Sequence, residues 1–256
     1  MEIVTVPILK DNYAFVLVDR SRQQATVFDP GESSLITAWL VNNNLELANI
    51  WITHHHRDHI GGIPGLLQRF PRAIVSGGAN DRGRIPSQHI YLNEGDRVTF
   101  ADQTAQIFFI PGHTLGHIAY YFAPTDHQPG ELFCGDTIFG GGCGRLFEGT
   151  PVQMLESIDR LRQLPDSTRM WCSHEYTLNN LRFALTIEPC NIDLQHRYHK
   201  AEVDRANSQP TIPSTIGLEQ QTNPFLRWDV PAVGLAVASN NSVETFARLR
   251  GRKEQF

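Results

Sequence analysis

The sequence is poor in cysteine and contains no long hydrophobic run. Its 256 residues include only four cysteines, none of them in a C-x-x-C pair, which argues against a secreted disulfide framework. No stretch approaches the roughly 20 apolar residues of a membrane span, and the first residues lack the basic start and apolar core of a signal peptide. We therefore expect a cytoplasmic protein with no membrane partner.

An excess of positive charge is also lacking. The formal net charge is -5, whereas a nucleic-acid binder usually shows a basic excess, so we expect no nucleic-acid partner. Basic residues nevertheless gather at the end of the chain, at Arg248, Arg250, Arg252 and Lys253. This group fits an anion site, and it fits the solvated end of a helix equally well.

No internal repeat or low-complexity segment is present, and the hydrophobic pattern divides the chain in two. Short apolar runs between turns predict strands at 3–6, 15–18, 25–29, 50–53, 73–76, 98–100, 106–110, 119–122, 132–134 and 170–172. Between them, helices are expected at 34–41, 63–70 and 154–164. Beyond residue 174 the pattern becomes helical, at 178–187, 193–206 and 243–250. We therefore expect an α/β domain at 1–174 and a small all-helical domain at 175–256.

The most informative motif is the run Thr-His-His-His-Arg-Asp-His at 53–59. It follows a predicted strand and offers four potential metal ligands, His54, His56, Asp58 and His59. Imidazole and carboxylate together suit Zn, Fe or Mn better than the oxygen-only sites of Ca or Mg. His54 and His56 are two apart and should point the same way, while Asp58 and His59 turn toward a second point. The motif thus indicates two metals.

Three further candidates each follow a predicted strand. They are His113, Asp136 and His174, which stand beside glycine or other small residues. A single histidine in such a place usually has a structural, hydrogen-bonded role. The motif at 53–59 makes a metal-ligand role the favoured interpretation for these three residues, because ligands at several strand ends could converge on it.

These motifs resemble those of the metallo-β-lactamase superfamily: T-H-H-H-x-D-H, G-H-T-x-G-H, a G-D loop and a late S-H-E. Within it, segments 142–150, 172–177, 223–227 and 250–256 are similar to the glyoxalase II (hydroxyacylglutathione hydrolase) family. The resemblance runs over essentially the whole chain. It implies a metallo-β-lactamase-type αββα sandwich of the α/β class, followed by the helical domain, which would help to bind glutathione.

The resemblance also implies a ligand set. One ion would be bound by His54, His56 and His113 and the other by Asp58, His59 and His174, with Asp136 bridging both. Two divalent ions per chain are expected, Zn first, although such a site also accepts Fe or Mn.

The implied reaction is hydrolysis of S-(2-hydroxyacyl)glutathione, such as S-D-lactoylglutathione, to glutathione and D-lactate, the second step of methylglyoxal detoxification. A hydroxide shared by the two metals would attack the thioester, because bound divalent ions lower the pKa of water toward about 7. Asp58 would orient or deprotonate this bridging water. The leaving thiolate, with a pKa of roughly 8.5 by analogy with cysteine, needs no strong general acid.

Glutathione contacts are implied for Arg145, Phe147, Tyr176, Arg250 and Lys253. At Phe147 some family members have a tyrosine, so one hydrogen bond worth roughly 0.5–1.5 kcal/mol is missing here. We therefore predict weaker substrate binding than in the tyrosine form. Cys134 and Cys143 stand near the site in the sequence, but their glycine neighbours favour a backbone role.

Other interpretations were weighed against this one. The main alternative is a glutathione persulfide dioxygenase of the same superfamily, which uses a single iron; the complete second ligand set disfavours it. A nuclease or phosphodiesterase is disfavoured by the acidic balance. His55 should point away from the metals, and His117 should support the His113 loop through a hydrogen bond. We expect a monomer.

Overall fold

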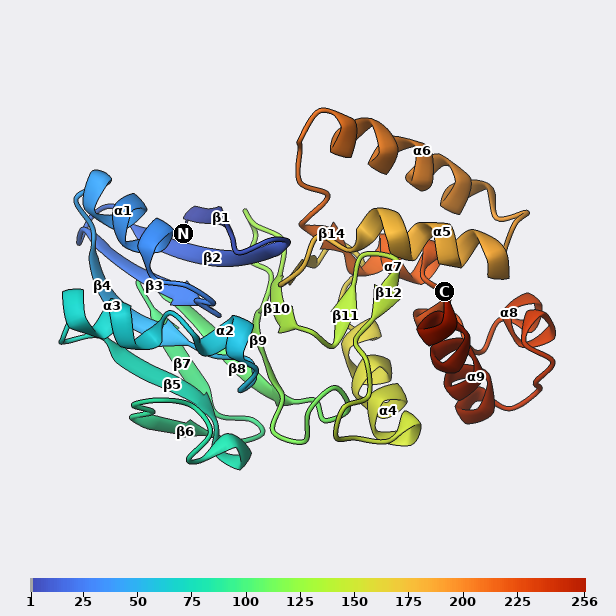
Figure 1. Ribbon diagram of the computed structural model, residues 1–256, viewed down its shortest axis with the longest axis horizontal. Helices are drawn as coiled ribbons and strands as arrows, with labels where there is room; N and C mark the ends of the chain where they lie inside the picture. Colours follow the sequence, from blue (N-terminus) through green and yellow to red (C-terminus); the bar gives the residue numbers. More distant parts are fainter. Residues whose placement is uncertain (1) are drawn as a thin grey trace. The chain divides into compact units, whose positions relative to one another are not determined.

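The computed structural model describes residues 2–256, and most of its strands belong to two mixed sheets (Figure 1). The first sheet has the order β1-β2-β3-β4-β5-β6 and consists of β1 (Glu2–Ile8), β2 (Asn12–Asp19), β3 (Gln24–Phe28), β4 (Glu46–Trp51), β5 (Ile74–Gly78) and β6 (Ile90–Leu92). Pairing is antiparallel from β1 to β3 and parallel from β3 to β6.

The second sheet has the order β14-β13-β10-β9-β8-β7. Its strands are β7 (Arg97–Phe100), β8 (Gln103–Phe109), β9 (Ile118–Phe122), β10 (Glu131–Gly135), β13 (Arg169–Cys172) and β14 (Ser214–Thr215). A separate hairpin is formed by β11 (Ile138–Phe139) and β12 (Gly142–Cys143). The α/β class predicted from the sequence is confirmed.

By its internal contacts the chain forms two compact units, each built from several segments. The first contains residues up to Phe109 together with Leu115–Ala123 and Phe133–Gly135. The second contains Ile110–Thr114, Pro124–Leu132 and Asp136–Phe256.

In the first unit, side chains alternate between the two faces of each strand, as strand geometry requires. Val27 and Ile50 belong to a core that includes residues of α1 (Ser34–Asn42) and α3 (Ile63–Arg69), which lie against the first sheet in Figure 1. Their neighbours Phe28 and Trp51 point to the opposite face. The parallel strands β3 and β4 therefore bury side chains on both faces, as parallel strands usually do.

An aromatic layer fills that opposite face. Phe28 stacks on Phe133 with ring centroids 4.0 Å apart, and Trp51 stacks on Tyr120 at 5.4 Å. The buried Tyr120 hydroxyl donates a hydrogen bond to the carbonyl of Ile52 (3.0 Å). The layer therefore fixes the end of β4, the point from which the histidine motif begins.

The second unit contains most of the helices. They are α4 (Pro151–Arg162), α5 (Thr177–Ile187), α6 (Ile192–Ala206), α7 (Ile216–Thr222), α8 (Pro231–Ala236) and α9 (Ser242–Gln255). Figure 1 shows α5 and α6 side by side, with Leu181, Ala184, Leu194 and Ala201 buried between them. No helix of residues 2–256 has the length and apolar character needed to cross a membrane.

The sequence pattern located the longer elements but not their ends. The strand expected at 50–53 stops at Trp51, and the helix expected at 243–250 continues to Gln255. The hairpin β11–β12, the strand β14 and the short helices α7 and α8 were not predicted. Each is too short to show a hydrophobic period of its own.

Candidate metal centre and cationic cluster

In the first unit, the histidine motif forms a cluster of ligand atoms beyond β4. His54 and His56 lie in the loop after Trp51 rather than on the strand, yet His54 Nε2 is 3.1 Å from His56 Nδ1. Asp58 and His59 belong to the one-turn helix α2 (Arg57–Ile60). Ligand atoms of His54 and His59 lie within 4.8 Å of each other. The four predicted ligands of this motif are thus brought together, by a loop and a helical turn instead of a strand end.

Asp29, at the end of β3, orients two of these imidazoles. Its carboxylate accepts hydrogen bonds from the Thr53 backbone N–H (2.8 Å) and from the Thr53 hydroxyl (2.7 Å), and lies 3.1 Å from His59 Nδ1. Thr53 Oγ1 is in turn 3.1 Å from His54 Nδ1. With Nδ1 engaged, the Nε2 atom of each ring is the one available to a metal, an arrangement common for ligating histidines.

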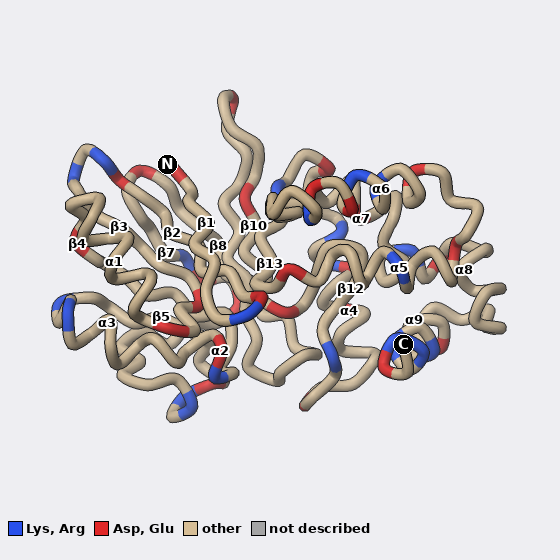
Figure 2. Tube along the Cα trace, turned by 45° about the horizontal axis from the view of Figure 1, so that its top comes forward, with Lys and Arg blue, Asp and Glu red and all other residues tan. Residues whose placement is uncertain are grey.

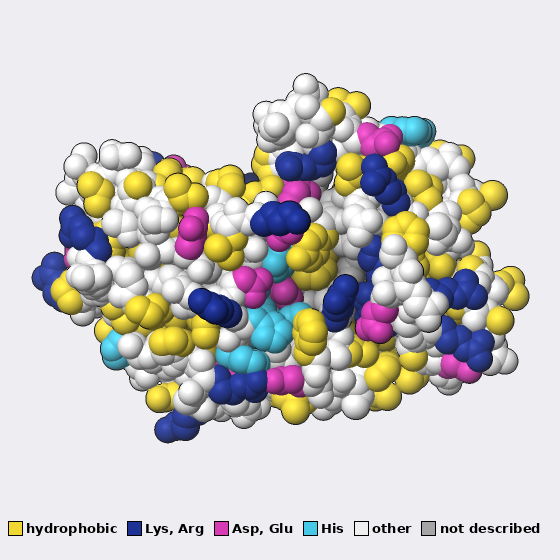
Figure 3. Space-filling view, in the orientation of Figure 1, with side chains coloured by type: hydrophobic (Ala, Val, Ile, Leu, Met, Phe, Trp, Pro, Cys, Tyr) yellow, Lys and Arg dark blue, Asp and Glu magenta, His cyan; other side chains and the backbone are white. Residues whose placement is uncertain are grey.

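Asp58 has a more open environment than the histidines. Its Oδ2 accepts a hydrogen bond from Asn12 Nδ2 (3.0 Å) and lies 3.5 Å from His59 Nε2, and 40% of the side chain is exposed. Gly31 makes the close packing here possible, since a Cβ at that position would lie 2.2 Å from the Asp58 carbonyl oxygen. Figure 3 shows histidine side chains, in cyan, reaching the surface, so solvent has access to part of the histidine set.

In the second unit, the other three predicted ligands also form a cluster. His113 Nε2 and His174 Nε2 lie 3.5 Å and 3.3 Å from Asp136 Oδ2, and all three residues are buried. His113 Nδ1 is 2.8 Å from the carbonyl oxygen of Arg145, so that nitrogen donates and Nε2 again remains for a metal. The three residues follow β8, β10 and β13, at the strand ends where the sequence placed them.

The supporting histidines are held by their own partners. His55 Nδ1 lies 3.0 Å from the buried Asp81, and Arg84 contacts both residues. The His117 ring stacks on His54 with centroids 4.6 Å apart. His55 therefore has partners other than the predicted ligands. The expected role of His117 as a support of the His113 loop stays a prediction; its Nδ1 lies 3.1 Å from the Ile118 carbonyl oxygen, and its ring packs on that of His54.

The basic C-terminal run, visible on α9 in Figure 2, divides into two kinds of residue. Arg248 pairs with Glu244, and Arg252 donates to a carbonyl near the end of α8, so these two act as helix-end cations. Arg250 is 95% buried, with a relative exposure of 5%, and donates from NH1 to the Cys143 carbonyl (2.9 Å). Both interpretations of the run thus hold, for different residues.

Lys253 and Cys143 have pKa values altered by this environment. Burial, followed by repulsion from Arg250, lowers the pKa of Lys253 to about 8, and Arg145 adds to the repulsion. Burial raises the pKa of the Cys143 thiol to about 11, although Arg250 acts against that rise. Arg145, Arg250 and Lys253 therefore form a cluster, here called the cationic cluster, that favours an anionic ligand. The high pKa of Cys143 disfavours a nucleophilic role.

Two aromatic residues of the predicted substrate set stand next to ligand imidazoles. The Tyr176 ring stacks on His174 with centroids 4.6 Å apart. Phe147, which is 62% exposed, presents its ring edgewise to His113 at 5.3 Å. An exposed aromatic ring of this kind offers an apolar contact to a ligand at little cost in conformational entropy.

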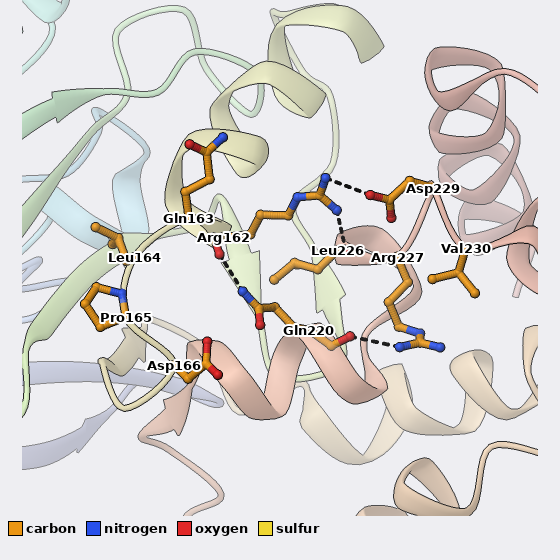
Figure 4. A pocket seen from close by; sticks show the side chains of 10 residues that line it. All are labelled: Arg162, Gln163, Leu164, Pro165, Asp166, Gln220, Leu226, Arg227, Asp229 and Val230. Atoms are coloured by element: carbon orange, nitrogen blue, oxygen red, sulfur yellow. Dashed lines mark hydrogen bonds and ion pairs between the residues drawn. The ribbon is translucent and has the colours of Figure 1, made fainter.

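A pocket of about 590 Å³ lies elsewhere in the second unit (Figure 4). Its two arginines are already bonded: Arg162 to Asp229 and the Leu226 carbonyl, Arg227 to Glu188 and the Gln220 carbonyl. Saturated guanidinium groups and the carboxylates beside them do not favour an anion. The cationic cluster is therefore a better candidate for an anion than this pocket.

Some supporting residues could not be identified from the sequence. Asp29 is the last residue of the strand predicted at 25–29, and neither Asn12 nor Asp81 belongs to any motif. Each acts from a different part of the chain, through contacts that only the folded structure creates. The sequence offers one sign of such a supporting residue, a polar side chain at the end of a buried strand, and of these three residues only Asp29 shows it.

Comparison with known proteins agrees with this geometry. The family model "Metallo-beta-lactamase superfamily" matches residues 11–174, and "Hydroxyacylglutathione hydrolase C-terminus" matches residues 175–256. Curated relatives named hydroxyacylglutathione hydrolase include those of a Cyanothece species (57% identical) and a Synechocystis species (54%), in each case over 100% of both chains.

Among solved structures, the B3 metallo-β-lactamase BLEG-1 matches with a TM-score of 0.66 and 24% identity, covering 88% of this chain and 99% of that one. ETHE1 from Myxococcus xanthus matches at 0.67 and 21%, covering 98% and 90%. These two likenesses show the fold alone. The family models and the curated relatives show more: the chain belongs to the hydroxyacylglutathione hydrolase family of the metallo-β-lactamase superfamily.

Proposed function

We propose that this enzyme hydrolyses S-(2-hydroxyacyl)glutathione, with S-D-lactoylglutathione as its substrate and glutathione and D-lactate as its products. The observation that supports this most strongly is the identity of more than half of all residues, over the full length, with curated hydroxyacylglutathione hydrolases. The cationic cluster adds a second, independent argument, since glutathione carries carboxylates that such a cluster attracts.

The chemistry of the donor set fits divalent metal ions, which this fold and its His/Asp clusters bind. We propose two ions, the first held by His54, His56 and His113, the second by Asp58, His59 and His174, with Asp136 shared. Five imidazoles and two carboxylates suit Zn, Fe or Mn. The Nδ1 partners of His59 and His113 support the assignment, because they leave Nε2 as the ligand atom.

Divalent ions in such a site lower the pKa of water and polarise a carbonyl group. The remaining roles in the reaction belong to residues of the chain. Asp58, held by Asn12 and partly open to solvent, is placed to accept the proton of the attacking water. The leaving thiolate would depart without a general acid, because its pKa is roughly 8.5 by analogy with cysteine.

Substrate recognition is assigned to the cationic cluster and its aromatic neighbours. Arg145 and Lys253 would pair with glutathione carboxylates, Tyr176 would offer its hydroxyl, and Phe147 would pack against the peptide. Arg250 is mostly buried and bonded to the chain, so we assign it a smaller share of direct contact than the sequence suggested. The neighbouring charges on Arg250 and Arg145 that depress the pKa of Lys253 are the charges a bound anion would neutralise.

Thioester hydrolysis by metal-loaded protein is the deciding assay, with and without a chelator and alongside metal counting. His113→Ala should lose at least a hundredfold in turnover, whereas the matched control His127→Ala, at an exposed position, should keep the activity of the parent. Metal-loaded protein that turns over no glutathione thioester would refute the proposal.

The persulfide dioxygenase alternative makes a different prediction. It requires one iron per chain and oxygen uptake on glutathione persulfide, whereas the proposed hydrolase consumes no oxygen. The domain boundary between residues 174 and 175, the monomeric state and the cytoplasmic location likewise remain proposals. Analytical ultracentrifugation tests the monomer directly.

A further inference from the structure

The segment Asn-Pro-Phe-Leu-Arg at 223–227 is one of the motifs that mark the family resemblance, yet the proposed chemistry gives it no task. In the structure Asn223 is fully buried, at the end of α7. Its Nδ2 donates to the carbonyls of Phe139 (3.2 Å) and Gly142 (2.9 Å), both on the hairpin β11–β12. A buried amide that donates to two carbonyls of one hairpin holds that hairpin in place.

Glu219, one turn earlier on α7, completes the attachment. Its Oε2 accepts from the Gly141 backbone N–H (2.9 Å) and from Asn223 Nδ2 (3.0 Å). Its Oε1 is bonded to Arg197 and Ser214, and Glu219 itself is fully buried. Because the carboxylate is fixed from one side by helix α6, it can hold the hairpin turn rigidly from the other.

The glycine-rich sequence of the hairpin turn is what allows this close packing. Gly141 has φ of +68°, a conformation that favours glycine. A Cβ at Gly140 would lie 2.3 Å from Thr177 Oγ1, and one at Gly142 would lie 2.6 Å from Asn180. The glycine run therefore lets the hairpin pack closely against α5, with its backbone groups exposed to Asn223 and Glu219.

The other end of the hairpin leads to the metal ligands. Gly144, which follows β12, packs so closely that a Cβ there would lie 2.0 Å from the Asp136 carbonyl oxygen and 2.9 Å from His113 Nδ1. The next residue, Arg145, supplies the carbonyl oxygen at 2.8 Å from His113 Nδ1. A shift of the hairpin would move the backbone that orients both ligands.

We propose that Asn223 and Glu219 are positioning residues for Asp136 and His113, acting through the hairpin β11–β12. The helical part of the chain would thereby set metal affinity as well as bind substrate. The inference rests on the proposed ligand roles of Asp136 and His113. It does not depend on which thioester is hydrolysed.

The sharpest test is Asn223→Asp, which keeps the shape of the side chain and the acceptor for the Phe225 N–H. It places an oxygen against the carbonyls of Phe139 and Gly142 and the carboxylate of Glu219. Zinc affinity, measured by competition with a chelator, should fall about 10- to 100-fold, as loss of a supporting residue does at other metal sites. At saturating zinc, kcat should fall more than KM rises.

The matched control is Glu188→Gln, which breaks a buried ion pair with Arg227 in the same unit without touching the hairpin. It should lower the melting temperature and leave zinc affinity within about twofold of the parent. If Asn223→Asp does not fold, Asn223→Ser removes the hairpin donors without adding charge and should show the same loss of zinc affinity.

Parental zinc affinity in a folded Asn223 variant, or an equal loss in Glu188→Gln, would overturn the inference. Failure of the proposed function would look different. In that case the parent would bind zinc and hydrolyse no glutathione thioester, while the comparison of zinc affinities would still decide the role of Asn223.

Discussion

If Lys253 binds a glutathione carboxylate as proposed, its depressed pKa should make substrate binding dependent on pH. With a pKa of about 8, roughly nine tenths of the ammonium groups are charged at pH 7 and about one tenth at pH 9. If only the charged form pairs with a glutathione carboxylate, the apparent KM is proportional to 1 + 10^(pH − pKa). It should therefore rise about tenfold between pH 7 and pH 9, and kcat should change far less.

The groups around Lys253 support this assignment of the titration. Arg250 and Arg145 are the cations that face it, Cys143 remains a neutral thiol over this range, and the Lys253 ammonium donates to the Asn179 carbonyl (3.3 Å). Since the pKa of Lys253 in the folded protein lies below its usual value of 10.5, the unfolded chain binds more protons between pH 8 and pH 10.5. The free energy of unfolding should accordingly rise from pH 8 to pH 10.5.

Steady-state kinetics from pH 7 to pH 9 on three proteins tests the reasoning. Lys253→Arg keeps a charge that does not titrate here, so its KM should stay flat. Lys253→Met should show a raised and equally flat KM. A tenfold rise in the KM of Lys253→Arg over the same range would refute the role of Lys253, because the titrating group would then lie elsewhere.

Other predictions concern the metal ligands and the substrate wall. Asp29→Ala removes the carboxylate that accepts two hydrogen bonds from Thr53 and lies 3.1 Å from His59 Nδ1, and it should lower zinc affinity about 10- to 100-fold in chelator competition. Gly144→Ala places a Cβ against the Asp136 carbonyl; by calorimetry it should lose about 1–3 kcal/mol of stability, together with bound metal. Phe147→Tyr should lower KM roughly two- to tenfold if the regained hydroxyl bond is worth 0.5–1.5 kcal/mol; an unchanged or higher KM contradicts that. Chelation should abolish thioesterase activity and added zinc should restore it.

The α/β class and the approximate places of the candidate ligand residues could be predicted because they depend on local patterns. A buried strand ends in a loop of small and polar residues, so His113, Asp136 and His174 could be located one strand at a time. What holds these residues could not be predicted. The contacts of Asp29 with Thr53, and of Asn223 with the hairpin, join segments far apart in sequence, and no local period encodes them.

The basic run at the C-terminus is a second feature whose role could not be predicted from the sequence. From the sequence, an anion site and a solvated helix end were equally acceptable interpretations of Arg248, Arg250, Arg252 and Lys253. The structure divides the four according to the face of α9 on which each lies: Arg250 is buried against Cys143, whereas Arg252 is exposed. Composition gives the charge of a helix, but packing decides which of its charges can meet a ligand.

The burial of Cys143 has a consequence for redox chemistry. An enzyme that releases glutathione also meets its oxidised form, a disulfide that exchanges with a cysteine thiolate to give a mixed disulfide and one free glutathione thiol. With a pKa of about 11, only about one Cys143 side chain in ten thousand is a thiolate at pH 7, and the thiolate is the species that enters disulfide exchange. The burial that raises the pKa of Cys143 should therefore slow its reaction with oxidised glutathione at this position next to the proposed substrate cluster.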